Sequence, residues 1–473
     1  MSSPGNPALG GQFASFWRVV RQSLRGEQID YTRVSLNRAV LLLAVPMVLE
    51  MIMESLFAIS DVFWVSHLGR DAVAVVGLTE SVMMLIYAVA IGISIAATAI
   101  VARRIGEKDP EAAAQAAGQV ILLGVALSAA LGLVLSYFAD DILELMGADD
   151  AIVTLGTDFA RIMLGGNATV FLIFLINAIF RGAGDAVLAM RTLWLANALN
   201  IVLGPCFIFG WGPFPEMGVA GAAVATNIGR GTGVLYQLWH LGRSDGRVHV
   251  QLRHLRPATD LLGNVMSTAW NGIAQMLIGT TSWIGLFKIL SLFGSASLAG
   301  FTIAMRVVMF ALMPAWGLAN AGATLVGQNL GAGQPERAVA AIRIATRFNM
   351  IFLGIVGVIF IVFAQPIVAT FTDDAEVLRE GVRALWIVSL AFPLYAAGMC
   401  LEAAFNGAGD TWTPTRLNFI CFWLLQIPLA WILSGTLGLG PTGIFISVPV
   451  AFSALTALSA WLFVRGKWKE KRV

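Results

Sequence analysis

Charged residues are scarce in this chain of 473 residues: they make up 12% of it, against about 25% in a typical soluble domain. Apolar residues account for 58%. Such a chain cannot cover a water-exposed surface with charge, so a soluble enzyme and a nucleic-acid-binding protein are both excluded. The small net charge of +2 points to no charged partner.

Cysteine and histidine are also few. The four histidines have no metal-ligand spacing, and no nucleophile elbow or phosphate-binding loop is present. The sequence therefore predicts neither an enzyme nor a metal site, and no cofactor beyond a coupling ion. Three cysteines lie in apolar stretches, where we expect them to pack as small hydrophobic residues: Cys206, Cys400 and Cys421.

A cleavable signal peptide is not evident either, because the first long apolar run begins only near Leu36 and has no small-residue cleavage site. Residues 1–35 form a basic segment instead. Apolar residues from Phe13 to Leu24 share one helical face, and three arginines flank it. This pattern predicts a cytoplasmic amphipathic helix on an anionic membrane surface, with a partly ordered basic tail as the alternative.

Long apolar runs are what the chain has in abundance. Each of the runs that follow Leu36 is long enough to cross a bilayer as a helix, and several approach 30 residues, which suits a tilted or kinked helix. The sequence predicts an all-α integral membrane protein with twelve transmembrane helices. They are expected near residues 36–65, 72–101, 116–138, 160–180, 187–210, 218–240, 263–292, 298–327, 341–365, 384–405, 413–435 and 442–464.

Basic residues are distributed unevenly among the connections between these runs. Arg103, Arg104, the connection 243–256 and the tail 467–472 would share one side of the membrane, whereas the loop 139–158 carries acids and no Lys or Arg. By the positive-inside rule, the basic side is cytoplasmic. We therefore expect a multi-pass protein of the cell (inner) membrane with both termini in the cytoplasm.

The chain also repeats itself at an offset of 225 residues. Ile105–Ala113 matches Leu330–Ala338, and Arg181-Gly-Ala-Gly-Asp185 matches Asn406-Gly-Ala-Gly-Asp410. Six helices per copy make the repeats parallel, with a pseudo-two-fold axis along the membrane normal. The predicted organisation is a lobe over 36–240, a linker over 241–262, a second lobe over 263–464 and a basic tail over 465–473, with a central cleft between the lobes.

Three carboxylates lie within the first apolar run: Glu50, Glu54 and Asp61. Their spacings place them on one stripe of a helix, and each charged acid costs about 2.5–3.5 kcal/mol at a bilayer centre. The stripe must therefore face a wet cavity or buried partners. The second copy has Gln275, a glycine and a leucine at these positions, so a cation site is expected in the first lobe.

At these residues the chain resembles the multidrug and toxic compound extrusion (MATE) family, most closely its DinF-like branch, from about residue 36 to residue 464. The family consists of twelve-helix antiporters that expel organic cations in exchange for protons or sodium ions. The motifs that carry the resemblance are Pro46, Ser60-Asp-Val-Phe-Trp-Val65, Leu68-Gly with Ala72-Val-Ala-Val75, the two Gly-Ala-Gly-Asp turns and Gly218-Val-Ala-Gly-Ala222.

The resemblance assigns roles to three residues. Asp61 matches the acid of the first helix that is central to coupling, Pro46 matches the proline about which that helix is proposed to bend, and Asn200 matches an asparagine in the same polar pocket. The family often has an acid four residues after this asparagine, where this chain has Gly204. Glu54, on the same stripe as Asp61, is a candidate to replace that acid.

Each acid also has a simpler interpretation. Asp61 could be a solvated carboxylate near a helix end, Glu54 could serve structure if it has a basic partner, and Glu50 could pair with Arg230 or Arg306. If the acids are free, their mutual repulsion raises the affinity for a proton, a monovalent cation or a cationic drug, and competition for one site produces exchange.

Several further residues have weaker functional indications. Met47 and Met51 are candidates for a flexible substrate wall, although core packing is the commoner fate of methionine. Glu80 and Glu402 are secondary acids. Glu402 is expected near the cytoplasmic face, with a solvated or gating role, and Asp185 and Asp410 are expected to be helix N-caps. The polar residues predicted to line the cavity, or alternatively to bridge helices, are Asn177, Asn197, Thr226 and Gln275.

The sequence thus predicts a monomeric antiporter that exports amphipathic or cationic organic compounds in exchange for protons, with sodium as the other coupling ion. A flippase for a lipid-linked precursor is the main alternative. It would need a strongly basic cleft, which the acidic first helix argues against. A channel is less favoured, because two unequal repeats provide no ring of like residues.

Overall fold

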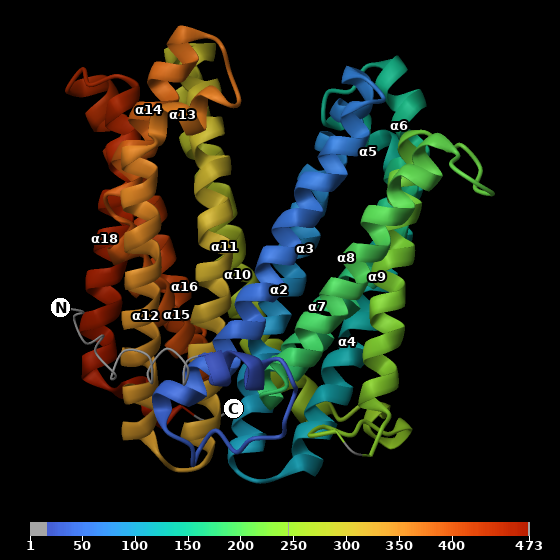
Figure 1. Cartoon of the computed structure of the whole chain (residues 1–473), viewed down its shortest axis with the longest axis vertical. Helices are drawn as coiled ribbons and strands as arrows, with labels where there is room; N and C mark the ends of the chain where they lie inside the picture. Colours follow the sequence, from blue (N-terminus) through green and yellow to red (C-terminus); the bar gives the residue numbers. More distant parts are fainter. Residues whose placement is uncertain (1–16, 245, 472–473) are drawn as a thin grey trace, which may run out of the picture.

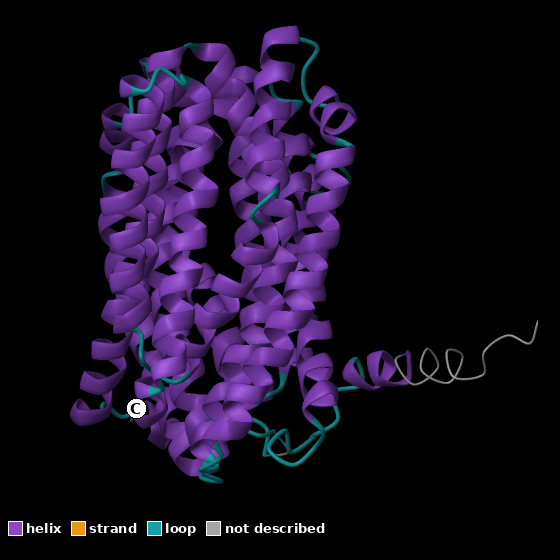
Figure 2. Ribbon diagram, turned by 90° about the vertical axis from the view of Figure 1, so that its left-hand side faces the viewer, coloured by secondary structure: helices purple, strands orange, loops and turns teal. Residues whose placement is uncertain are grey.

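The computed structural model describes residues 17–244 and 246–471, and within them the chain is helical without strands. Figure 1 shows long helices running side by side, with short helices capping one end, and Figure 2 shows the same bundle from the side. This confirms the predicted class, an all-α membrane protein.

The helices of the first half precede the linker, and those of the second half follow it. The first half contains α2 (Leu36–Ser66), α3 (Arg70–Gly106), α4 (Pro110–Tyr137), α5 (Ala139–Leu145), α6 (Asp150–Gly165), α7 (Asn167–Ala183), α8 (Ala186–Phe209) and α9 (Val219–Leu241). The second half contains α10 (Thr259–Leu290), α11 (Ser295–Gly331), α12 (Pro335–Val362), α13 (Ala364–Ala369), α14 (Ala375–Ser389), α15 (Phe392–Gly407), α16 (Trp412–Asn418), α17 (Ile427–Trp431) and α18 (Pro441–Arg465).

Ten of the described helices or continuous helix pairs are long and apolar enough to cross a membrane. The pair α14 and α15, bent by 55°, makes an eleventh. The twelfth expected span is α9, which is more polar because it carries Asn227, Arg230 and Gln237. It packs against α8 like a member of the bundle.

Two spans are longer than predicted, and each has an aspartate at its N-cap position. The fourth begins at Asp150 and breaks at Gly166, where α6 gives way to α7. The tenth begins at Ala375. Asp149 and Asp374 accept hydrogen bonds from the first backbone amides of α6 and α14. The polarity that marked these stretches as loops therefore serves helix capping.

The eleventh span departs from regular α-helical geometry. Between α16 and α17 the backbone forms a π-helix over Phe419–Gln426, and a second one follows over Ile432–Thr436. Pro428, near the start of α17, lacks an amide hydrogen and so favours irregular hydrogen bonding at this point.

The linker is shorter than predicted, because α10 begins at Thr259 rather than near 263. It folds against the first half: the Gln119 side chain donates to the carbonyls of His254 and Arg256 and accepts from the amide of Ala258. Of the amphipathic segment, the structure describes a helix over 17–23, and the part from Phe13 to Phe16 lies outside the described residues.

Each half has its own hydrophobic core, and we call the halves the amino-terminal lobe (α2–α9) and the carboxy-terminal lobe (α10–α18). The lobes touch where glycines admit close backbone approach. A Cβ on Gly106 of α3 would lie 2.1 Å from the Gln328 carbonyl oxygen of α11, and one on Gly317 of α11 would lie 2.6 Å from that of Met47. Gly92 and Gly272 bring α3 and α10 together in the same way.

These contacts lie toward one end of the molecule, which we call the basic end; it carries the described termini, the α3–α4 turn and the linker. Figure 1 shows the two groups of helices meeting at this lower end and diverging toward the upper end, where α5, α6, α13 and α14 lie. The chain before α2, dark blue in Figure 1, lies across the basic end.

Of the two repeat-motif aspartates predicted to be N-caps, Asp185 does occupy the N-cap position of α8, whereas Asp410 does not occupy that of α16. Asp185 makes no capping hydrogen bond at the start of α8. Asp410 precedes the N-cap of α16, accepts a hydrogen bond of 2.7 Å from the Thr413 hydroxyl and lies 3.6 Å from the Lys471 ammonium. The glycines before them do have the expected left-handed backbone, with φ of 85° at Gly184 and 84° at Gly409.

Candidate functional site

Glu50 lies fully buried on α2, with its side chain directed at α7. The Arg181 guanidinium donates to its Oε1 at 2.8 Å, and the Asn177 amide donates to the same oxygen at 3.2 Å. Arg230 and Arg306, the expected partners, are therefore not its partners. The true partner, Arg181, lies in the last turn of α7 and is followed by Gly-Ala-Gly, so from sequence it resembled a loop residue outside the membrane.

Glu54, one turn further along α2, has the basic partner that its structural interpretation required. Arg230 of α9 donates to its Oε1 at 3.0 Å, and Asn197 of α8 donates to its Oε2 at 3.0 Å. Its charge is therefore matched by a guanidinium. Glu54 does not stand as a free carboxylate in place of the acid absent at Gly204.

Arg230 is enclosed by aromatic side chains and is only 2% exposed. Its guanidinium lies 5.1 Å from the ring centre of Phe57, 5.9 Å from that of Phe174 and 6.0 Å from that of Tyr87. Cation–π attraction adds to the ion pair. The Nε and Nη1 atoms of Arg230 are buried without a hydrogen-bond partner among the described residues.

Asp61 differs from the other two acids of the stripe. It is half-buried, and within the described chain it has no hydrogen bond and no ion pair. Glu80 of α3 and Arg230 lie within electrostatic range of it. Glu80 is itself exposed and within electrostatic range of Arg306 on the other lobe. Among the acids of α2, Asp61 is therefore the one whose charge no direct partner neutralises.

The amides and hydroxyls predicted near the acids mostly bridge helices. Asn200 donates to the Thr226 hydroxyl at 2.8 Å and so joins α8 to α9 rather than contacting an acid. Asn177 accepts from Gln237 at 2.6 Å while donating to Glu50. These buried bonds connect α2, α7, α8 and α9 in one polar network.

The predicted substrate wall is only partly in place. Met47 is 1% exposed and packs in a core shared by α2 and α11, so its assignment to a cavity is wrong. Met51 is half-buried beside it. Gln275 is 3% exposed, and its Oε1 has no partner among the described residues. Pro46 lies buried inside an unbroken α2, one turn before Glu50.

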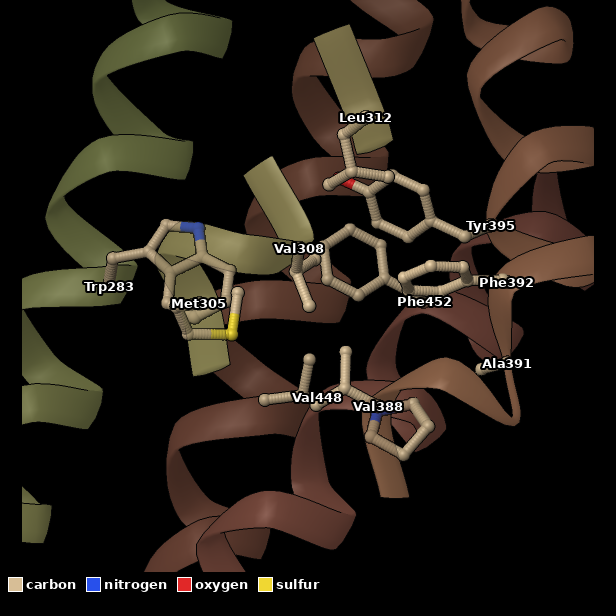
Figure 3. A pocket seen from close by; sticks show the side chains of 11 residues that line it. Trp283, Met305, Val308, Leu312, Val388, Ala391, Phe392, Tyr395, Val448 and Phe452 are labelled. Carbon is tan, nitrogen blue, oxygen red and sulfur yellow. The ribbon is translucent and has the colours of Figure 1, made fainter. Parts of the chain in front are cut away.

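The carboxy-terminal lobe holds an aromatic pocket that sequence reasoning missed. Figure 3 shows Trp283, Phe392, Tyr395 and Phe452 around it, with Met305 and Val308 of α11, and none of its lining residues is charged. The repeat offset was the available signal: Met305 and Phe452 correspond to Glu80 and Asn227 of the first lobe. The two lobes thus present surfaces of opposite polarity at equivalent positions.

Glu402 is half-buried rather than fully solvated, and the gating role that was the other expectation stays a prediction. Its Oε1 is buried without a hydrogen-bond partner in the described part of the chain, and Tyr395 lies within electrostatic range of it. Its sequence position near the Asn406 turn suggested solvent, but α15 packs between α11, α12 and α18.

Comparison with known proteins assigns the fold and the family. The MatE family model matches residues 46–206 and 272–432, which are the two repeats. The probable multidrug resistance protein NorM of Thermotoga maritima is 28% identical over 444 residues, covering 93% of this chain and 94% of that protein. An FAD transporter of Shewanella oneidensis is 26% identical over 88% of this chain and 91% of its own length.

Solved structures agree with the sequence comparisons. A MOP superfamily transporter from Pyrococcus furiosus, described as having a binding pocket of reverse polarity, superimposes with a TM-score of 0.87 at 27% identity, covering 94% of this chain and all of that one. A multidrug resistance MATE family transporter in an outward-facing conformation gives the same TM-score and identity. The chain therefore belongs to the MatE family, the multidrug and toxic compound extrusion family, and is a membrane transporter rather than an enzyme.

Proposed function

We propose that the protein is a secondary active antiporter that exports amphipathic organic cations in exchange for protons. The observation that carries the proposal is the state of the three acids of α2: Glu50 and Glu54 are paired with arginines, whereas Asp61 is half-buried and unpaired. The printed names of relatives, which include multidrug resistance and multidrug export proteins, support an exporter of this kind.

A carboxylate in this position binds either a proton or a cation. The nearby charge of Glu80 disfavours a second negative charge at Asp61, and both a proton and an organic cation relieve that repulsion. Because only one of them occupies the site at a time, proton entry displaces substrate. In coupling to sodium, a sodium ion would take the place of the proton and would displace the substrate from the same carboxylate.

The paired acids have another role in this mechanism. Each is bonded to a guanidinium and to an amide of other helices, so Glu50 and Glu54 hold α2 against α7, α8 and α9. Asn200 and Thr226 reinforce the α8–α9 contact. Of the three acids of α2, Asp61 is then the one left free to exchange a proton for substrate.

The placement in the membrane belongs to the same proposal. The basic end carries the α3–α4 turn, the linker and the carboxy-terminal tail, and the positive-inside rule assigns such an end to the cytoplasm. Both termini are then cytoplasmic, in the cell (inner) membrane. The lobes meet at the cytoplasmic end, and alternating access moves that contact to the opposite end. We take a monomer as the working unit.

The test is efflux of a fluorescent cationic dye from proteoliposomes under imposed proton or sodium gradients. Wild type is expected to respond to the proton gradient, and Asp61→Asn is expected to lose that response while folding normally. Glu216→Gln, an exposed acid in the α8–α9 loop, serves as the matched control and should transport like wild type. Efflux driven only by sodium would contradict the proton model, and full activity of Asp61→Asn would remove Asp61 from the mechanism.

A second candidate, transport of an anionic compound, is favoured by one observation: two buried donors of Arg230 have no partner. The Shewanella relative named an FAD transporter makes a flavin nucleotide the natural probe. Uptake of a fluorescent flavin nucleotide by the same vesicles, lost in Arg230→Gln, would favour this candidate or the related lipid-precursor flippase. Cation efflux without flavin movement would favour the antiporter.

A further inference from the structure

The last turn of α7 receives side chains from three other segments of the chain. The carbonyl of Arg181 accepts from the Thr324 hydroxyl at 3.0 Å, and that of Gly182 accepts from the Gln328 amide at 3.0 Å. The next two carbonyls, of Ala183 and Gly184, accept from Arg247 at 3.0 Å and from the Tyr31 hydroxyl at 3.2 Å. Four successive carbonyls are thus each bound by a side chain.

These donors join both lobes. Thr324 and Gln328 belong to α11 of the carboxy-terminal lobe, Arg247 belongs to the linker, and Tyr31 belongs to the segment before α2. The final carbonyls of a helix have no partner within the helix, so they are free to accept such bonds. The end of α7 is therefore a point where the lobes are held together at the basic end.

Glycine is required for this convergence. A Cβ on Gly182 would lie 2.8 Å from the Thr98 carbonyl oxygen, and one on Gly184 would lie 2.7 Å from the Tyr31 ring. In the second copy of the motif, the carbonyls of 406–409 accept no side-chain donor from the described residues. The turn is therefore present in both lobes, but among the described residues its carbonyls bind side chains of the other segments in the amino-terminal lobe and not in the carboxy-terminal lobe.

The same turn is bonded to the acid stripe through Arg181. Its guanidinium donates to Glu50 on α2 at 2.8 Å, while its own carbonyl receives Thr324 of the opposite lobe. Both Glu50 and Thr324 are 0% exposed. α2 itself packs between α8 of its own lobe and α11 of the other. One residue thus connects the helix of the stripe to the contact between the lobes.

We propose that the Glu50–Arg181 ion pair is a positioning element that couples α2 to the closure between the lobes at the basic end. The proposal rests on the alternating access included in the proposed function. With the pair intact, the end of α7 is held where Thr324 and Gln328 bind it, and the basic end stays closed. When the pair is broken, the turn loses that position, the two bonds weaken and the basic end opens.

The test measures conformation rather than transport. Spin labels at Glu144→Cys in α5 and Asp373→Cys before α14, both exposed at the end opposite the basic end, report the distance between the lobes there. The three native cysteines are replaced by alanine in every variant. Glu50→Gln is expected to raise the ratio of the short-distance to the long-distance population about fivefold or more, at the lower limit of typical coupling between sites.

Three further variants make the result specific. Thr324→Val with Gln328→Leu removes the donors and should shift the ratio in the same direction. When Glu50→Gln is added to this double variant, the further change in the ratio should be smaller than the change that Glu50→Gln causes alone. The reason is that the ion pair acts on the lobes through the bonds that the double variant has already removed. Glu54→Gln breaks the neighbouring ion pair on the same helix and should leave the ratio within twofold of wild type, as the matched control.

The proposal is overturned if Glu50→Gln keeps the wild-type distribution, if its effect adds fully to that of the donor variants, or if Glu54→Gln shifts the ratio equally. Should Glu50→Gln fail to fold, Glu50→Gln with Arg181→Gln leaves no unpaired buried charge and takes its place with the same expected shift. The distance measurement uses no substrate and no ion gradient. If Asp61→Asn kept full dye efflux, the proposed role of Asp61 would fail, but the distance measurement would still test the Glu50–Arg181 pair.

Discussion

The buried charges of the amino-terminal lobe are arranged as two arginine–carboxylate pairs, and each pair is completed by an amide. Glu50 has Arg181 and Asn177, and Glu54 has Arg230 and Asn197. A buried ion costs several kcal/mol to desolvate. A single charged partner left alone therefore destabilises the fold more than either the intact ion pair or the removal of both charges. At the residue scale, Glu50 and Glu54 are therefore paired, and Asp61 is the acid of α2 without a direct partner among the described residues.

Removing one partner of a pair should cost far more than removing both. We expect Arg230→Met to lower the free energy of unfolding by about 3 kcal/mol, because Glu54 is left largely enclosed without its cation. Arg230→Met with Glu54→Gln should recover most of that loss. Thermal unfolding of the purified protein in detergent measures both, and a double variant no more stable than the single one would refute the argument.

The segment before α2 is tied to the α3–α4 turn by an ion pair outside the membrane. Asp30 lies 2.8 Å from the Lys108 ammonium and accepts from Thr32. Partial burial of Asp30 opposes ionisation, but the bonds from Lys108 and Thr32 outweigh it and lower the pKa of Asp30 to about 2. This element therefore depends on a carboxylate that stays charged at neutral pH.

A pH dependence follows from the lowered pKa of Asp30. Its value in the unfolded chain is about 4, so the stabilisation is fully present above pH 4 and is lost as the pH falls toward 2. Because Asp30 is partly exposed, we expect Asp30→Asn to cost only about 1 kcal/mol at pH 7. The difference from wild type in unfolding experiments should shrink between pH 4 and pH 2. A difference that is constant over this range would rule out the ion pair as its cause.

The turn after α7 depends on a left-handed glycine in a crowded position. Gly184→Ala should destabilise by more than the roughly 1–2 kcal/mol that a left-handed backbone costs a residue with a Cβ, since that Cβ would also meet Tyr31, Arg247 and Gln328. Gly212→Ala is the control: its φ is 72°, yet nothing lies within 4 Å of the added Cβ. Equal melting temperatures for the two variants would show that crowding contributes nothing.

At the scale of the whole molecule, the lobes meet partly through a side-chain core shared by α2 and α11 and partly through close backbone approach. Glycines of α3 and α11 allow this at the basic end, where the distances to an added Cβ fall below van der Waals contact. Close contact at one end is compatible with the alternating access that we propose, in which the lobes exchange this contact for one at the other end.

Adding one methyl group at this interface should act on both stability and conformation. A Cβ on Gly106 would meet the Gln328 carbonyl, so Gly106→Ala is expected to lower stability by about 1–3 kcal/mol and to favour separation of the lobes at the basic end. Gly77→Ala, on the same helix with nothing within 4 Å, should do neither. Melting temperatures and the spin-label distances described above check this, and a wild-type distance distribution in Gly106→Ala would contradict it.

Sequence alone determined the class, the number of spans, the repeat and the family. These depend on properties summed over many residues. About twenty apolar residues are needed to cross a bilayer whatever their neighbours, and a single offset of 225 residues relates several separate regions of the first copy to the second. The stripe of Glu50, Glu54 and Asp61 followed equally from helical period. Boundaries at α6 and α14 were wrong because a capping aspartate and a loop aspartate look the same in sequence.

Only the tertiary structure decided which acids are paired. Arg181 is 131 residues from Glu50, and Arg230 is 176 residues from Glu54; both pairs form because α7 and α9 present these side chains to one face of α2. A pattern along the chain identifies which residues share a helix face but not what another helix places opposite it. Asp61 therefore became distinct from its neighbours only through the positions of two arginines, since pairing depends on distance in space.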